Sequence, residues 1–197
     1  MTDYPSMNRL AELQQLIADF AKVERVAPMG DTGHRENDVE HSYGLALTCW
    51  YLQPKIAPRL DLLKIFKYAL AHDIVEVHAG DTFVFDETNK ATKDTREREA
   101  LEQVRADWPD FPDLAAYATG YMDKVDDEAR FVKAVDKILP VLLIELGLEH
   151  YNVWVERSVT LAHERDNKVS IHVSEYLSPY YEQLLAWLDE RGNIPKA

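Results

Sequence analysis

The sequence predicts an all-α fold, a compact helical bundle formed by a single domain over residues 1–197. Apolar residues recur at helical spacing in one segment after another, whereas the alternating pattern of a half-exposed strand is almost absent. Residues that cap helices precede several of these segments, and no internal repeat or linker divides the chain. A hydrophobic fraction of 46% with seven Gly and nine Pro is typical of a globular protein with one core.

Three helices are predicted in the first eighty residues. Their expected ranges are residues 8–24, 37–52 and 61–80. Between the first two, residues 27–33 break the pattern and predict a loop. Asn37 with Glu40 three residues later resembles a capping box, and Pro54 follows the end of that helix. Asp61 is the expected cap of the third helix.

Five more helices are predicted after an irregular stretch, residues 81–93, which is expected to form a loop over the site. Their expected ranges are residues 94–107, a short helix after 112, and then 126–146, 153–165 and 179–191. Pro140 is expected to kink the helix that contains it, because proline removes a backbone donor and crowds the preceding turn.

Composition excludes several classes of protein. A formal charge of −13 argues against a protein that wraps a nucleic-acid polymer through many phosphate contacts, although local cations can still bind one small phosphorylated molecule. Cys49 is the only cysteine, which excludes an intramolecular disulfide and a thiolate zinc cluster. No apolar run reaches the roughly 18 residues of a membrane span, so we expect a soluble, cytoplasmic protein without membrane contacts.

The stretch around residues 67–81 combines an apolar helical pattern with an imidazole and two carboxylates. His72, Asp73 and Glu76 are one, three and four residues apart, so they project from neighbouring parts of one helical surface. Polar groups on so apolar a segment are costly to bury without compensation. A bound cation is the simplest compensation, because imidazole and carboxylate are its usual ligands.

Two further residues are candidates for the same site. His41 stands in the first turns of the second predicted helix, and its alternative is a surface position. Asp136 stands in an apolar helical run, and its alternative is an ordinary ion pair with Lys133 or Lys137.

The ordered pattern of one His, then His-Asp, then a distant Asp resembles the HD-domain metal-dependent phosphohydrolases. Residues 35–42, Arg-Glu-Asn-Asp-Val-Glu-His-Ser, look like the segment with the first ligand in the 5'-nucleotidase branch. Residues 72–76, followed by Gly80 and Asp81, look like its second segment. The resemblance covers about residues 25–140 and implies a helical bundle of the HD-domain type and a homodimer. The aromatic C-terminal segment, with Tyr176, Tyr180, Tyr181 and Trp187, is the only support for a dimer within the chain.

The resemblance also implies roles for individual residues. One divalent transition metal (Mn, Co, Fe or Zn) would be bound by four ligands, namely His41, His72, Asp73 and Asp136. Glu76 would orient the attacking water and take its proton. Asp81 would contact the substrate or assist the attack, and its alternative is a turn residue after Gly80.

Substrate binding is implied for Arg25, because guanidinium binds phosphate oxygens bidentately, with a plain helix-end arginine as the alternative. Arg35 is the second candidate. Members of the branch that select deoxynucleotides carry Trp after the first arginine, whereas this chain has Val26, so the resemblance does not extend to deoxyribose selectivity.

The expected activity is removal of phosphate from small nucleotides, most simply (deoxy)nucleoside 5'-monophosphates, by attack of a metal-bound water. A (deoxy)nucleoside triphosphate triphosphohydrolase is the alternative on the same site. It needs several cations, for which Arg25, Arg35, Lys90 and Lys93 are candidates. A third hypothesis, from another class, is a non-catalytic protein that binds metal or nucleotide on the HD scaffold.

Overall fold

A computed structural model describes residues 4–80 and 87–196, with the side chains of 87–92 excepted. The helices of the first half are α1 (Met7–Phe20), α2 (Asp38–Ile56), α3 (Leu62–Ala71), α4 (Glu76–Ala79) and α5 (Glu87–Asp107). The second half has α6 (Pro112–Asp123), α7 (Asp127–Leu146), α8 (Val153–Glu156), α9 (Leu161–Lys168) and α10 (Tyr180–Arg191). Short 3-10 helices, η1 (Gly30–Thr32) and η2 (Val169–Val173), and two strands, β1 (Glu24–Pro28) and β2 (Arg35–Asn37), complete the described elements. The all-α prediction is confirmed.

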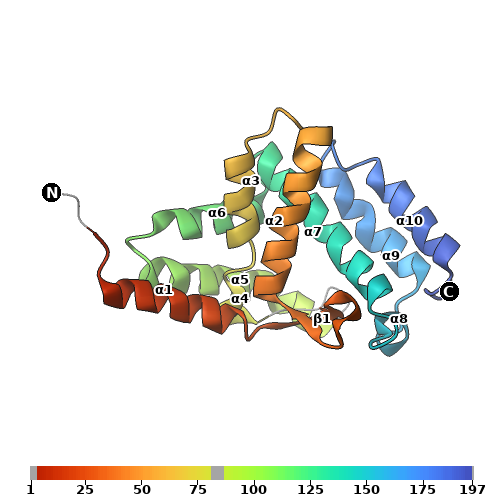
Figure 1. Ribbon diagram of the computed structural model, residues 1–197, viewed down its shortest axis with the longest axis horizontal. Helices are drawn as coiled ribbons and strands as arrows, with labels where there is room; N and C mark the ends of the chain where they lie inside the picture. The colour runs from red at the N-terminus through yellow and green to blue at the C-terminus, as the bar shows by residue number, and fades with distance from the viewer. Residues whose placement is uncertain (1–3, 81–86, 197) are drawn as a thin grey trace.

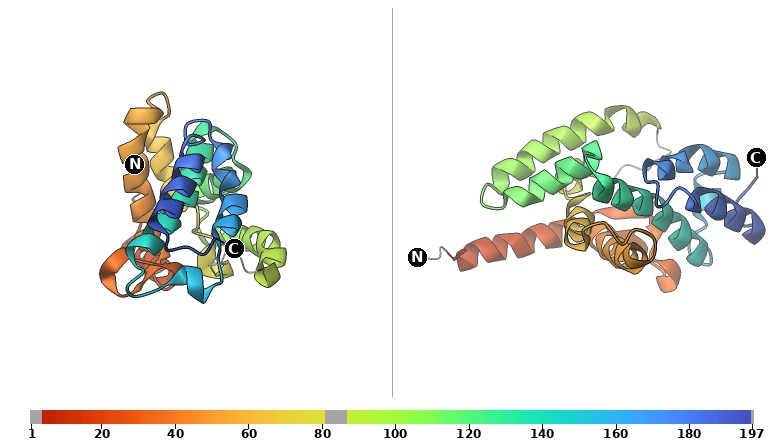
Figure 2. Two further views of the ribbon diagram at one scale, coloured as in Figure 1. Left: turned by 90° about the vertical axis from the view of Figure 1, so that its right-hand side faces the viewer. Right: turned by 90° about the horizontal axis from the view of Figure 1, so that it is seen from above.

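Helix α7 occupies the centre of the molecule and contacts α2, α3, α6, β1 and η2. Figure 1 shows α2 and α3 as a helical hairpin on one side of it, with α8, α9 and α10 gathered at the C-terminal end. Seen from above, α5 and α6 lie side by side (Figure 2), and α6 also packs against α3. Segments distant in sequence therefore meet along α7.

The two predicted helix caps, Asn37 and Asp61, are present, and the structure shows a third at Asp126. Asn37 accepts hydrogen bonds from the backbone of Val39 and Glu40, and the Glu40 side chain accepts one from the Asn37 backbone, which completes the capping box. Asp61 caps α3 through the Leu63 amide at 2.9 Å. Asp126 caps α7 through the Ala129 amide at 2.9 Å. These caps fix where the helices begin, because they satisfy amides that lack an intrahelical partner.

The predicted helix over residues 61–80 is wrong in its middle. Helix α3 ends at Ala71, residues 72–75 form a turn, and α4 begins at Glu76. Within this turn the Glu76 amide donates to the Asp73 carbonyl at 2.8 Å, a tighter i−3 pattern than that of an α-helix. His72 itself keeps helical backbone angles (φ −58°, ψ −43°), so the break lies in the hydrogen bonding of the residues after it.

The other differences involve short elements. The first helix ends at Phe20, and the expected loop instead contains β1 and η1, with β1 paired antiparallel to β2. The helix expected from residue 94 begins at Glu87, and the one expected over 153–165 is divided into α8 and α9. Pro54 lies inside the last turn of α2, and α7 continues through Pro140. Strands of three to five residues are too short to show a period in sequence.

Two hydrophobic clusters form the core and meet at the turn between α3 and α4. The larger one joins α2, α3, α7 and the C-terminal helices and includes Ala69. The smaller one joins α1, α5 and α6 and includes Ile74 and Val75. His72 and Asp73 lie between Ala69 and Ile74, so both clusters hold this short segment in place.

The aromatic C-terminal segment belongs to the first of these clusters. Tyr181 is buried, and Tyr176, Tyr180 and Trp187 are half-buried against the same core. The dimer therefore loses its only support in the sequence and stays a prediction. Separately, no helix within the described residues has the length and apolar character needed to cross a bilayer.

Gly147 is required where the end of α7 approaches η1. A Cβ built at this position would lie 2.6 Å from the Gly30 carbonyl oxygen and would also collide with the ring of Pro28. We expect Gly147→Ala to lower the free energy of unfolding by about 1–3 kcal/mol, as overpacking does. Gly44→Ala is the matched control, because a Cβ there meets nothing within 4 Å and alanine favours the helix. Urea denaturation measures both, and an unchanged midpoint for Gly147→Ala would contradict the close approach.

Candidate metal and substrate site

The structure brings four predicted ligands together from two helices and one turn. His41 lies in the first turn of α2, His72 and Asp73 lie in the turn after α3, and Asp136 is in the middle of α7. Ligand atoms of His41, His72 and Asp73 all lie within 4.8 Å of one another, and His41 Nε2 is 3.1 Å from Asp136 Oδ1. The rings of His41 and His72 are 5.4 Å apart. His41 is fully buried, which excludes the surface alternative.

The hydrogen bonding of His72 matches that of a metal ligand. Its Nδ1 lies 2.9 Å from the Ala69 carbonyl oxygen, which only accepts, so Nδ1 carries the proton. In the neutral ring Nε2 then has a free lone pair, and it lies 2.8 Å from Asp73 Oδ2, another acceptor, without a hydrogen bond. A divalent cation bound here would take the Nε2 lone pair and the Asp73 carboxylate as ligands. The donor set therefore fits a divalent metal.

His41 is oriented by a carboxylate that the sequence analysis missed. Glu36 Oε2 lies 3.1 Å from His41 Nδ1, which leaves Nε2 directed at Asp136. Burial and the charge of Arg25 lower the pKa of His41, but the hydrogen bonds to Asp136 and Glu36 outweigh them and raise that pKa to about 9. The metal-free protein thus holds a proton where a metal would bind.

Asp136 does not form the ordinary surface ion pair that was its alternative in the sequence. It is buried, and its Oδ2 accepts a hydrogen bond from the Tyr121 hydroxyl at 2.7 Å. Lys133 and Lys137 each lie 3.6 Å from the same oxygen. Burial opposes ionisation, but the charges of Lys137 and Lys133 and the His41 hydrogen bond hold the pKa of Asp136 well below its usual range. The carboxylate is therefore ionised, as a metal ligand must be.

Arg25 lies among carboxylates at the edge of this cluster. Its guanidinium is 2.9 Å from both Asp38 Oδ1 and Asp73 Oδ2 and 3.5 Å from Glu36 Oε2. Burial again opposes ionisation, but His72 and Arg25 hold the pKa of Asp73 well below its usual range. Arg25 thus fixes the orientation of Asp73, and its predicted contact with substrate phosphate stays a prediction.

Glu76 begins α4, one turn after Asp73, and is buried. Its carboxylate, with those of Asp38 and Asp73, forms a second group of oxygens within 4.8 Å of one another. Lys93 Nζ lies 3.9 Å from Glu76 Oε1 and 3.1 Å from Glu97 Oε1. A buried carboxylate beside the predicted ligands is the arrangement needed by a general base. Asp81, the other predicted catalytic residue, lies outside the described residues.

Arg35 is not brought into this cluster. Its guanidinium donates to the Val26 carbonyl, pairs with Glu156 at 2.9 Å and stacks over Tyr151 at 4.6 Å. These contacts tie β2 to α8, and the substrate-binding role of Arg35 stays a prediction. Val26 packs half-buried against the larger hydrophobic cluster.

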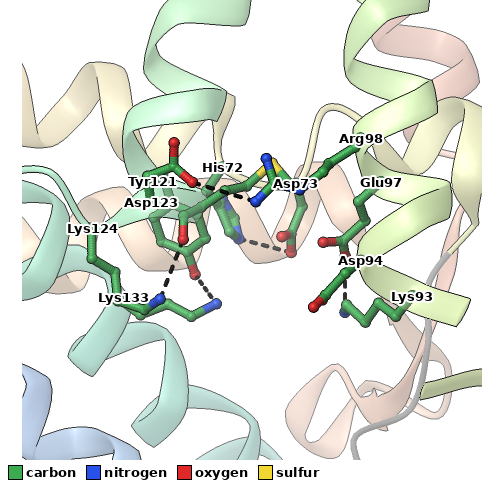
Figure 3. Close-up of a pocket in the computed structure, with 11 residues that line it drawn as sticks. His72, Asp73, Lys93, Asp94, Glu97, Arg98, Tyr121, Asp123, Lys124 and Lys133 are labelled. Carbon is green, nitrogen blue, oxygen red and sulfur yellow. Dashed lines mark hydrogen bonds and ion pairs between the residues drawn. The ribbon is translucent and has the colours of Figure 1, made fainter. Parts of the chain in front are cut away.

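A cavity of about 460 Å³ opens beside His72 and Asp73 (Figure 3). Its walls come from α5, α6 and α7 and include four basic side chains, those of Lys93, Arg98, Lys124 and Lys133. Neither Arg25 nor Arg35 is among the described residues that line it. Burial, followed by the charge of Lys137, lowers the pKa of Lys133 to about 8.

Sequence reasoning missed several members of the site. Glu36 points inward because it is the central residue of β2, between half-exposed neighbours, but three residues are too few to reveal that alternation. Tyr121, on α6, contacts Asp136 only through the packing of α6 against α7. Lys133 was considered only as an ion-pair partner. No signal in a single sequence distinguishes these residues from surface residues of the same type.

Metal binding is expected to release a proton. Because the pKa of His41 in the metal-free protein is about 9, its imidazole is protonated at neutral pH and must lose that proton to bind metal. Apparent affinity should therefore rise about tenfold per pH unit up to about pH 9 and then level off. Titration calorimetry in two buffers of different ionisation enthalpy measures the proton released. Binding at pH 7 without proton release would contradict this protonation state.

Comparisons with known proteins agree on the fold. A family model described as "HD domain" matches residues 20–175. A predicted metal-dependent phosphohydrolase from Magnetospirillum magnetotacticum is 28% identical, with a TM-score of 0.75 and coverage of 99% of this chain and 100% of that one. A conserved hypothetical protein from Pyrococcus furiosus has a TM-score of 0.62 at 20% identity, covering 88% of this chain and 98% of that one. A protein from Pyrococcus horikoshii has a TM-score of 0.62 at 22% identity, and the match covers 89% of this chain and 98% of that one.

The two archaeal structures show the fold alone at this level of identity. A search of the curated proteins found no match. The family match spans well over half of the chain and includes the segments of His41, His72, Asp73 and Asp136. The chain therefore belongs to the HD-domain family.

Proposed function

We propose that this protein is a divalent-metal-dependent phosphohydrolase that removes phosphate from (deoxy)nucleoside 5'-monophosphates. The observation that carries the proposal is the cluster of four ligand side chains, in which His72 Nε2 and Asp73 Oδ2 lie 2.8 Å apart beside His41 and Asp136. Mixed imidazole and carboxylate ligation suits Mn²⁺, Fe²⁺, Co²⁺ or Zn²⁺. The likeness to a predicted metal-dependent phosphohydrolase at 28% identity supports the same class of reaction.

Each part of the site has a task in this reaction. When bound, a divalent ion lowers the pKa of a coordinated water and withdraws charge from the phosphoryl oxygens. Glu76, buried beside Asp73, takes the proton of the attacking water at its carboxylate. Arg25 holds Asp73 in place through its ion pair at 2.9 Å. The neighbouring cavity, lined by four basic side chains, receives the phosphate and the nucleoside.

A triphosphohydrolase on the same site is the second candidate. The sequence alone offered few cations for a triphosphate, but Arg98, Lys124 and Lys133 add to Lys93 around the cavity. Acidic side chains of Asp94, Glu97 and Asp123 line the same walls and offset part of that charge, which favours the smaller anion.

Phosphate release tests the proposal. Purified protein is stripped of metal and supplemented separately with Mn²⁺, Co²⁺, Fe²⁺ and Zn²⁺, then assayed on ribo- and deoxyribonucleoside mono- and triphosphates with product identification. Metal-dependent orthophosphate from monophosphates is expected, and with Val26 after Arg25 we expect both sugars to be accepted.

Tripolyphosphate released from a triphosphate would move the assignment to the second candidate. Binding of metal and nucleotide without turnover of any of them would support the non-catalytic hypothesis instead. The homodimer, the cytoplasmic location and the exclusion of nucleic-acid polymers remain predictions, which sedimentation analysis, localisation and a binding assay would test.

A further inference from the structure

We propose that Lys133 and Lys93 form an anion subsite that holds the phosphoryl group of the substrate beside the metal ligands. This inference rests on the proposed function, since it assigns the phosphate-binding side chains of that same site. It differs from the sequence-based expectation, which gave this role to Arg25 and Arg35.

The two lysines come from different helices and face the same space. Lys93 lies on α5 and Lys133 on α7, and both line the cavity of about 460 Å³ with His72 and Asp73. Figure 3 shows the two side chains approaching from opposite walls, with the Asp73 carboxylate at the back of the space between them. An anion placed there would meet an ammonium on either side.

Within the described part of the chain, the Lys133 ammonium shares its carboxylate partner, Asp136, with Lys137. Its shortest contact is a hydrogen bond of 3.0 Å to the Tyr121 hydroxyl, a neutral group. The Asp136 oxygen 3.6 Å away already accepts from Tyr121 and is equally close to Lys137, so one carboxylate oxygen serves two cations. An incoming phosphate therefore stabilises this ammonium more than it would stabilise an ammonium that is already paired with a carboxylate of its own.

The arginines are placed differently. Arg25 is surrounded by three carboxylates within 3.5 Å, and Arg35 pairs with Glu156. The Lys93 ammonium is less neutralised than the Arg25 guanidinium but more than the Lys133 ammonium, because Glu97 lies 3.1 Å from it and fixes it at the cavity wall. We therefore expect Lys133 to contribute more to phosphate affinity than Lys93.

The test measures binding of inorganic phosphate by titration calorimetry, to protein loaded with Zn²⁺ and to the metal-stripped protein. Lys133→Gln removes the charge but keeps a donor for Tyr121, and it is expected to weaken phosphate binding ten- to a hundredfold in the loaded protein, as losing a hydrogen bond to a charged group does. Lys133→Arg should restore most of the affinity, and Lys93→Gln should weaken it less. Metal content measured by atomic absorption should stay at the wild-type level in all three.

The control for the change in net charge is Lys22→Gln, because Lys22 is exposed after the end of α1. This variant should bind phosphate like wild type. Equal phosphate affinity in wild type and Lys133→Gln would overturn the subsite, whereas the phosphohydrolase would stand if hydrolysis of monophosphates persists. Failure of wild type to bind phosphate would likewise overturn it. Phosphate binding that depends on Lys133, in a protein that hydrolyses no nucleotide, would support the subsite and contradict the proposed function.

Discussion

Glu76→Gln is expected to lower kcat for phosphate release by about 10²–10⁴-fold while the protein keeps its metal. The carboxylate is buried beside Asp73, where it can take a proton from the attacking water, and the amide of glutamine cannot accept that proton. Shape and hydrogen-bonding reach are nearly unchanged by the substitution, so KM should change little. Steady-state kinetics with measured metal content tests this directly.

Glu102→Gln is the matched control, because Glu102 is exposed on α5 and its ion pair with Arg105 lies within that helix. The control should retain wild-type kcat. A Glu76→Gln variant with full activity would show that another group takes the proton. Asp81 would then be the next residue to test. A variant that loses its metal would show instead that Glu76 belongs to the ligand set.

His72→Ala is expected to lower the affinity for divalent metal more than about 100-fold and to abolish metal-dependent phosphate release. The imidazole presents a lone pair to the centre of the cluster, and alanine offers no ligand in its place. Loss of a partner that only orients a ligand typically costs 10–100-fold, and loss of the ligand itself costs more. Titration with Co²⁺, followed by its absorption spectrum, measures the affinity.

A graded series strengthens this experiment. Glu36→Gln removes only the carboxylate that orients His41, so its metal affinity should fall about 10–100-fold. His78→Ala changes a histidine of α4 that lies 3.5 Å from Asp107, outside the cluster, and should bind metal like wild type. If His72→Ala bound metal as tightly as His78→Ala, the proposed ligand set would be wrong.

Much of the fold was predictable because its signals are local. Helical periodicity needs only neighbouring residues, and the caps at Asn37, Asp61 and Asp126 act on amides two or three residues away. The turn after Ala71 was not predictable in this way. Residues 72–75 continue the apolar pattern of α3 in the sequence, whereas the structure packs Ala69 and Ile74 into different hydrophobic clusters.

The sequence by itself determined the helical fold and the residue types of the site, because spacing along a helix and the ligand chemistry of His, Asp and Glu are properties of the chain. Only the tertiary structure decided which charges meet. It placed Glu36 behind His41, enclosed Arg25 among carboxylates, directed Arg35 to Glu156 and left Lys133 facing the cavity. Electrostatic interactions depend on distance and burial in space, and α7 brings Asp136 to His41, 95 positions away in sequence, only when the bundle is packed.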